Sequence, residues 1–242
     1  TYTTRIDVDI NDNNSVYGVF SYNKETNLRP DADTTSFSAV PGVTQSSENK
    51  TLSLGYRRVF SANIFNELRF GNFRSFVPFT RTVPVPAFRL SLPLVSNPET
   101  SFLDQGRRVN NYTFADDVNW IAGKHSIKFG GQIQTFAVDA YNDGGIVATY
   151  TIGTGTNTPQ FSSGLFPGGI NNTQLTTANS LFALLGGVVN AGSQSFNTVD
   201  LTSGFQATRL FQPFRYSNDA LYIQDRWTVA KGLTVSLGLR YD

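Results

Sequence analysis

The sequence predicts an all-β fold, an antiparallel up-and-down transmembrane β-barrel segment of about eight strands. Two observations carry this prediction. Apolar and polar residues alternate with period two in segments of about ten residues, which is the length of a tilted strand that crosses a bilayer. Short and long links also alternate strictly along the chain, so that all the short turns lie at one end of the predicted sheet. This sorting is typical of bacterial outer-membrane barrels, which have short periplasmic turns and long extracellular loops.

The clearest strand pair lies in residues 215–242. Its last strand has apolar residues at the odd positions and polar residues or glycine at the even ones: Leu233, Val235, Leu237, Leu239 and Tyr241 against Thr234, Ser236, Gly238, Arg240 and Asp242. The preceding strand places Leu221, Ile223 and Trp227 on one face and Tyr222, Gln224 and Arg226 on the other. Lys231 and Gly232 mark the turn between the two strands.

Three further hairpins repeat this unit along the chain. Their turns are expected at Asn11–Asn14, Phe60–Asn63 and Ala122–Lys124. Their apolar faces consist of Ile6, Val8, Ile10, Val16, Gly18, Phe20, Tyr22, Leu52, Leu54, Tyr56, Leu68, Phe70, Tyr112, Phe114, Val118, Trp120, Ile127, Phe129 and Ile133. The alternation changes phase after Thr135, which indicates either a bulge or a strand that rises above the membrane.

Three long links are predicted to be loops, over residues 23–49, 77–108 and 142–212. Pro78 and four other prolines in the second link argue against a strand inside a sheet. The third link is far longer than an ordinary loop, and its apolar run Leu181–Val189 predicts a short packed helix or strand. We expect these loops to select the ligand, since the third one carries large aromatic rings among polar neighbours: Phe161, Phe166, Phe196, Phe205 and Phe211. The alternative is that these rings pack the loop onto itself or onto the barrel rim.

The charged residues of the predicted strands mostly share the polar face: Asp7, Asp9, Arg57, Glu67, Arg69, Asp117, Lys128, Arg226, Arg240 and Asp242. Charges are costly on a lipid-facing surface near the bilayer midplane, so this face should line the lumen. The aromatic residues Trp120, Trp227 and Tyr241 stand near strand ends, as an interfacial girdle requires. A soluble sheet with a solvated outer face would show the same alternation and remains an alternative.

Composition argues against several other functions. The 19 Lys and Arg nearly balance the 18 Asp and Glu, so a basic surface for nucleic acid is not expected. The chain has no Cys, which excludes thiolate catalysis and thiolate metal sites. We predict no catalytic residue, no cofactor and no metal site. The single His125 lies at a tight turn beside Lys124 and fits a structural or solvent-facing role, and Asp9, Asn11, Asp12 and Asn13 fit a turn better than a calcium loop. Gly153-Thr154-Gly155 likewise lacks the pattern of a phosphate-binding loop.

The segments LYIQDRWTVAKGLTVSLGLRYD and VNWIAGKHSIKFGGQIQ resemble barrel strands of TonB-dependent outer-membrane receptors, in particular the Oar-like branch. NSLFALLG, which begins at Asn179, is similar to an apolar segment of that branch. The resemblance implies a barrel of 22 strands with a plug domain and a TonB box. Residues 1–242 would then be a partial barrel domain, about a third of the strands, with the plug and the box outside this sequence.

The resulting hypothesis is an outer-membrane transport receptor that takes up a scarce solute such as a siderophore, an oligosaccharide or a peptide. Its partners would be outer-membrane lipid, the plug, the TonB complex and the extracellular solute. Two alternatives stay open, namely a complete small outer-membrane barrel with a structural or adhesive role and a secreted carbohydrate-binding β-sandwich. The sequence identifies neither the solute nor the ligand-contacting residues.

Overall fold

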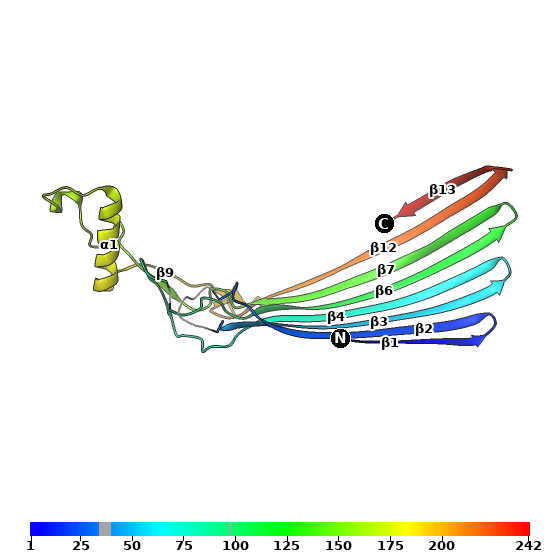
Figure 1. Ribbon diagram of the computed structural model, residues 1–242, viewed down its shortest axis with the longest axis horizontal. Coiled ribbons are helices and arrows are strands. Elements are labelled where there is room, and N and C mark those ends of the chain that lie inside the picture. The colour runs from blue at the N-terminus through cyan, green and yellow to red at the C-terminus, as the bar shows by residue number, and fades with distance from the viewer. Residues whose placement is uncertain (34–39, 97) are drawn as a thin grey trace.

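The computed structural model describes residues 1–33, 40–96 and 98–242. Its main body is one antiparallel sheet of eight long strands in the order β1-β2-β3-β4-β6-β7-β12-β13, so each strand pairs with the next long strand of the chain (Figure 1). The strands are β1 Tyr2–Asn11, β2 Asn14–Leu28, β3 Val43–Ser61, β4 Ile64–Arg81, β6 Gln105–Ala122, β7 His125–Asn142, β12 Leu210–Ala230 and β13 Leu233–Tyr241. The predicted up-and-down arrangement of eight strands is therefore confirmed.

All four hairpin turns lie at the same end of the sheet, at the right of Figure 1. Gly123 and Gly232 adopt φ values of 63° and 81°, the left-handed conformation that tight turns require. In the first turn the Asn11 side chain accepts a hydrogen bond from the backbone N–H of Asn13, with 3.0 Å between nitrogen and oxygen. The interpretation of this Asn-rich stretch as a turn is thus confirmed.

The register aligns the predicted apolar residues into rows across the sheet. Leu54 of β3 lies between Gly18 and Phe70, and Ile223 of β12 lies between Phe129 and Leu239. These rows are uncovered, since Leu54 is 41% exposed and Ile223 is 52% exposed. One face of the sheet is therefore largely apolar and uncovered, which suits contact with an apolar environment.

The predicted charged residues fall together on the opposite, polar face. Asp117 of β6 accepts hydrogen bonds from the Arg69 guanidinium of β4 and from the Tyr222 hydroxyl of β12. The Tyr17 hydroxyl donates to Glu67 over 3.2 Å. This cross-strand network places cations and carboxylates on one side, as the period-two pattern predicted.

Three acidic side chains depart from this division, because the register places Asp116, Asp219 and Asp225 in the apolar rows. Asp116 and Asp225 each have a partner on a neighbouring strand. Asp116 accepts a hydrogen bond from the Asn66 amide, and an oxygen of Asp225 lies 2.6 Å from Nδ1 of His125. The sequence pattern did not predict these pairs because it treats each strand separately.

Several strands extend further than the sequence predicted. β4 continues through Pro78 to Arg81, so the predicted loop over residues 77–108 is too wide. Pro78 pairs with Gly106 of β6, whereas the ladder with β3 is interrupted between the Phe76 and Phe79 pairs, where proline lacks its N–H. β7 shows no bulge after Thr135 and stays in register to Asn142.

The other predicted loops are also shorter in the structure than the sequence predicted. β2 runs to Leu28 and β3 begins at Val43, so the strands occupy much of the predicted loop over residues 23–49. Residues 34–39 of that loop, and Asn97 of the second one, lie outside the described residues. Phe211 is part of β12 and pairs with Tyr141, which removes it from the third loop.

The long connections form small elements of their own at the end opposite the turns. β5 (Arg89–Ser91), β8 (Thr149–Ile152) and β9 (Val189–Ser193) make a three-stranded sheet, and β10 (Asn197–Thr198) pairs with β11 (Phe205–Gln206). Most of the buried apolar side chains lie near these loops: Val43, Leu103, Val147, Ile152 and Ala183. The best-packed core is therefore at the loop end.

A short 3₁₀ turn, η1 (Ser163–Leu165), precedes the helix α1 (Asn172–Gly186), which stands away from the long sheet at the left of Figure 1. Asn171 and Gln174 form a capping box at its start, and Gly187 ends it with φ 65°. Of the two predicted alternatives, a short helix or a strand, the structure has the helix, which begins well before Leu181 and ends before Val189. Leu185 is 85% exposed, so the helix is only partly packed. Within the described residues, no helix is long and apolar enough to cross a membrane.

The long sheet is open, because β1 and β13 are its two edges and do not pair with each other. A closed eight-stranded barrel requires that pairing, so the interpretation as a complete small barrel is wrong for this structure. A β-sandwich needs a second sheet over the core face, whereas both faces of the eight-stranded sheet keep exposed residues. The sandwich alternative is also wrong.

The division into two faces predicts opposite responses to arginine at neighbouring positions. Leu54→Arg places a charge in the apolar rows, and in a bilayer it should lower the free energy of unfolding by about 2 to 4 kcal/mol. Ser53→Arg places the same charge on the polar face and should have a much smaller effect. Urea unfolding of the full-length protein in lipid vesicles measures both, and equal losses at the two positions would contradict a membrane-facing surface.

The sorting of turns and loops predicts which positions are reachable from outside a cell. This chain has no cysteine, so Thr156→Cys and Lys231→Cys introduce single labelling sites in it. A membrane-impermeant maleimide added to intact cells should label Thr156→Cys, at the loop end, and not Lys231→Cys, in a turn. Asn13→Cys serves as a second turn control. Labelling of either turn variant in intact cells would contradict the predicted orientation of the turns and loops.

Candidate binding site among the loops

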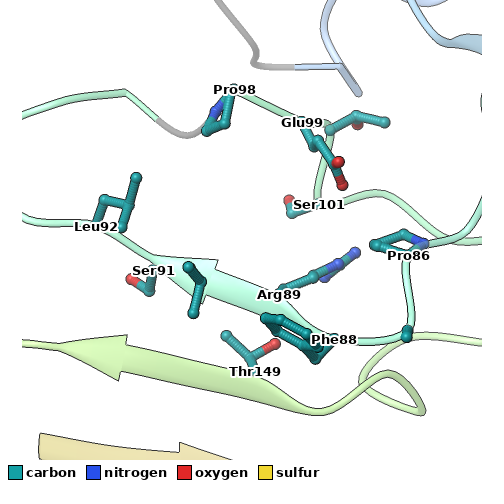
Figure 2. A pocket seen from close by; sticks show the side chains of 12 residues that line it. Pro86, Phe88, Arg89, Ser91, Leu92, Pro98, Glu99, Ser101 and Thr149 are labelled. Carbon is teal, nitrogen blue, oxygen red and sulfur yellow. The ribbon is translucent and has the colours of Figure 1, made fainter. Parts of the chain in front are cut away.

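A cavity of about 550 Å³ lies at the loop end, where the second long connection meets β8. This volume is within the range of small-molecule sites. Its lining, drawn in Figure 2, comes from residues 86–92 and 98–101 together with Thr149. Half of the lining residues are prolines or apolar residues, and Arg89, Glu99 and four hydroxyl side chains supply the polar atoms.

Parallel pairing between two loops positions this lining. Arg89 of β5 stands opposite Thr149 of β8, and the Arg89 N–H donates to the Ala148 carbonyl with 2.8 Å between nitrogen and oxygen. The Phe88 ring packs edge-on against Tyr150, with 6.1 Å between centroids. β8 is in turn paired with β9. Two loops that are far apart in sequence are thus held as one platform.

Arg89 is the central polar side chain of the cavity. Its guanidinium makes no hydrogen bond to any described residue, and its Nε and Nη2 atoms are buried without a partner. Burial lowers the pKa of Arg89, the nearby positive charge of Arg81 lowers it further, and Glu99 acts in the opposite direction. Burying a cation without a partner is unfavourable, so this side chain has unused capacity to bind an anion.

Arg81, at the end of β4, is a second guanidinium close to the cavity. Its side chain donates to the carbonyl oxygens of Val83, Pro84, Thr100 and Phe102 over 2.6 to 3.1 Å. Arg81 is buried, and no carboxylate of the described residues forms an ion pair with its side chain. It therefore closes the second loop onto the sheet while keeping its positive charge.

An ion pair closes the base of the third loop. Arg209 donates two hydrogen bonds to Asp143, each 2.7 Å long, and its guanidinium lies 4.4 Å from the centroid of the Tyr141 ring. The hydrogen bond to Asp143 raises the pKa of Arg209. Because the two residues flank β7 and β12, this pair fixes both ends of the loop to the long sheet.

The aromatic residues predicted to select the ligand do not line this cavity. Phe161 packs against Phe166 and against Phe182 of α1, with centroids 6.1 and 5.0 Å apart. Phe196 and Phe205 are exposed at other places in the loop. Arg89 was not among the residues predicted from the sequence. The feature of the sequence that could have indicated Arg89 is its position as the single charged residue within the proline-rich apolar stretch VPVPAFRLSLPL.

The remaining candidates for chemistry lie elsewhere. His125 is at the turn end, stacked on Trp227 with 5.4 Å between ring centroids and paired with Asp225. His125 therefore has a carboxylate partner, and its side chain is 41% exposed. Among the described residues no group of three or more His, Asp or Glu is placed to hold a metal ion. The N–H of Gly155 is bonded to the Thr158 hydroxyl in a local turn.

A long antiparallel sheet with one apolar face, one polar face, tight turns at one end and a loop platform at the other defines the wall of a transmembrane β-barrel. The chain belongs to the outer membrane beta barrel domain family, whose model matches residues 1–242. It is accordingly a protein of the bacterial outer membrane, so the apolar face meets lipid, the turns are periplasmic and the loops are extracellular.

The structure is similar to the crystal structure of the outer membrane transporter YddB from Escherichia coli, with a TM-score of 0.55. The sequences are 11% identical, and the match covers 99% of this chain and 26% of the transporter chain. At this identity the likeness shows the fold alone, and this chain spans about a quarter of that transporter. No curated protein matches the sequence.

The half-buried ion pair at the base of the third loop predicts a local effect. Arg209→Ala should weaken the closure of residues 142–212 by about 1 to 2 kcal/mol, because it removes two charge-assisted hydrogen bonds. Hydrogen exchange of amides near Asp143 in the detergent-solubilised full-length protein measures this loss. The matched control is Arg215→Ala, since the Arg215–Asp139 pair is exposed at 55% and 53% and should contribute between about 0 and 1 kcal/mol. Equal effects of the two variants would contradict a closing function of Arg209.

Proposed function

We propose that this chain is part of the barrel of a TonB-dependent receptor that takes up a scarce solute across the outer membrane. The observation that carries the proposal is the extracellular platform, in which β5 and β8 join two loops around a cavity on a rigid barrel wall. Binding residues commonly sit on loops held by such a scaffold. The resemblance of LYIQDRW and LTVSLGLRYD to strands of these receptors supports the same function.

In this proposal the chain acts by binding and by forming the wall, and it performs no catalysis. The apolar rows contact outer-membrane lipid, and the polar face, with its Arg69–Asp117–Tyr222 network, faces a plug domain or water. The plug and the segment that engages the TonB complex would be contributed by other parts of the receptor. The open edges of β1 and β13 would pair with further strands of the larger barrel.

A structural or adhesive function is the second candidate, supported by the exposed apolar surface of α1, where Leu185 is 85% exposed. Such a surface on an extracellular helix suits contact with another macromolecule. An adhesive barrel needs no energy input, whereas TonB-dependent uptake does. The energy requirement therefore separates the two functions.

The proposal predicts uptake that depends on TonB. Cells expressing the full-length protein should grow on at least one iron chelate, oligosaccharide or peptide that cells lacking it cannot use. Deletion of TonB should abolish this growth while the protein stays folded in the outer membrane, as judged by heat-modifiable migration. Growth that persists without TonB would contradict the proposed mechanism, and adhesion without any uptake would favour the second candidate.

A further inference from the structure

We propose that the loop cavity binds a carboxylate group of a solute with an apolar body, and that Arg89 is the residue that anchors this carboxylate. This proposal names a class of ligand for the proposed receptor, and it rests on the proposed function only in assuming that the bound molecule is the transported solute. The residues that line the cavity belong to the second and third extracellular loops.

The charge balance of the cavity calls for an anion. Arg89 and Arg81 place two guanidinium groups in this part of the loops, and Arg81 is already bonded to four carbonyl groups. Glu99, the carboxylate that lines the cavity, is exposed and makes no ion pair with Arg89. A bound carboxylate would give the Arg89 guanidinium the partner that it lacks among the described residues.

The arrangement of the lining separates a charged side from an apolar one. Figure 2 shows Arg89 near Pro86 and Ser101, with Leu92 and Pro98 toward the opposite side of the cavity and Phe88 below. The Ser91, Ser101 and Thr149 hydroxyls add hydrogen-bonding groups. A ligand whose carboxylate meets Arg89 would place its apolar body against the prolines, Phe88 and Leu92.

The single available guanidinium favours a carboxylate over a phosphate. A planar carboxylate carries one charge and matches the fork of one guanidinium. A phosphate monoester carries up to two charges near pH 7 and would need a second free donor group, whereas Arg81 is committed to backbone carbonyls. Short apolar peptides with a free C-terminus fit both the charge and the volume of about 550 Å³.

The test measures binding to the purified full-length protein in detergent by isothermal titration calorimetry. The probes are N-acetyl-leucyl-phenylalanine, its C-terminal amide and inorganic phosphate. The acid should bind at least about tenfold more tightly than the amide, which is the contribution of one charge-assisted hydrogen bond. Equal binding of acid and amide, or tighter binding of phosphate than of the acid, would overturn the proposal.

Variants then assign the effect to the cavity. Arg89→Gln should weaken binding of the acid about tenfold or more and leave binding of the amide unchanged. Arg58→Gln is the matched control, because Arg58 lies at the turn end of β3 and stacks on Phe60, far along the chain from the cavity. An unchanged affinity of Arg89→Gln for the acid would overturn the assignment.

Glu99→Gln provides an independent check that does not remove the anchor. Loss of this exposed carboxylate at the cavity should tighten binding of the acid several-fold, since its charge opposes that of the ligand. Weaker binding would overturn the proposed charge balance. Binding and uptake are measured separately. TonB-dependent growth together with equal binding of acid and amide would contradict only the proposed carboxylate site. Acid-selective binding without uptake would contradict only the proposed transport function.

Discussion

The structure depends on one constraint, the continuous hydrogen-bonded register of the long strands. β7 stays in register with β6 and β12 over its whole length, from His125 to Asn142. Within a bilayer every backbone N–H and C=O must be paired inside the protein, so a break in this ladder would be costly. The same register fixes which face each side chain meets, because a slip by one residue would move all apolar side chains to the polar face.

Two of the acidic residues in the apolar rows, Asp116 and Asp225, are consistent with this constraint. Asp225 and His125 lie on adjacent strands near the periplasmic turns, beside the Trp227 ring that is expected at the membrane interface. Asp116 lies further from the turns and accepts a hydrogen bond from Asn66. A polar side chain facing lipid is costly without a partner, and here the partner comes from the neighbouring strand.

Features that depend on residues close together in the sequence could be predicted, whereas contacts between distant segments could not. Hairpins, turns and faces follow from period-two alternation and turn residues within some twenty positions of one another, so they could be read directly. The extensions of β2, β4 and β6 have little alternation of apolar and polar residues, so the period-two pattern did not predict them. Asn171 and Gln174 form a capping box, which is a helix-start signal in the sequence, although the prediction placed the element only from Leu181 onward. The parallel pairing of Arg89 with Thr149 joins residues that are far apart in the sequence, so no local sequence pattern predicts it.

The candidate site and the barrel wall are linked through residues at the ends of the strands. Arg81 ends β4, and its guanidinium bonds to carbonyls of the loop that carries Arg89. Arg209 and Asp143 do the same for the loop that carries β8. At Pro78 β4 pairs with β6 alone, and its pairing with β3 resumes at Phe79 and continues to Arg81, which brings Arg81 to the loop. The position of Arg89 therefore follows from the strand register, and a ligand bound there would contact a platform that the membrane-embedded sheet holds in place.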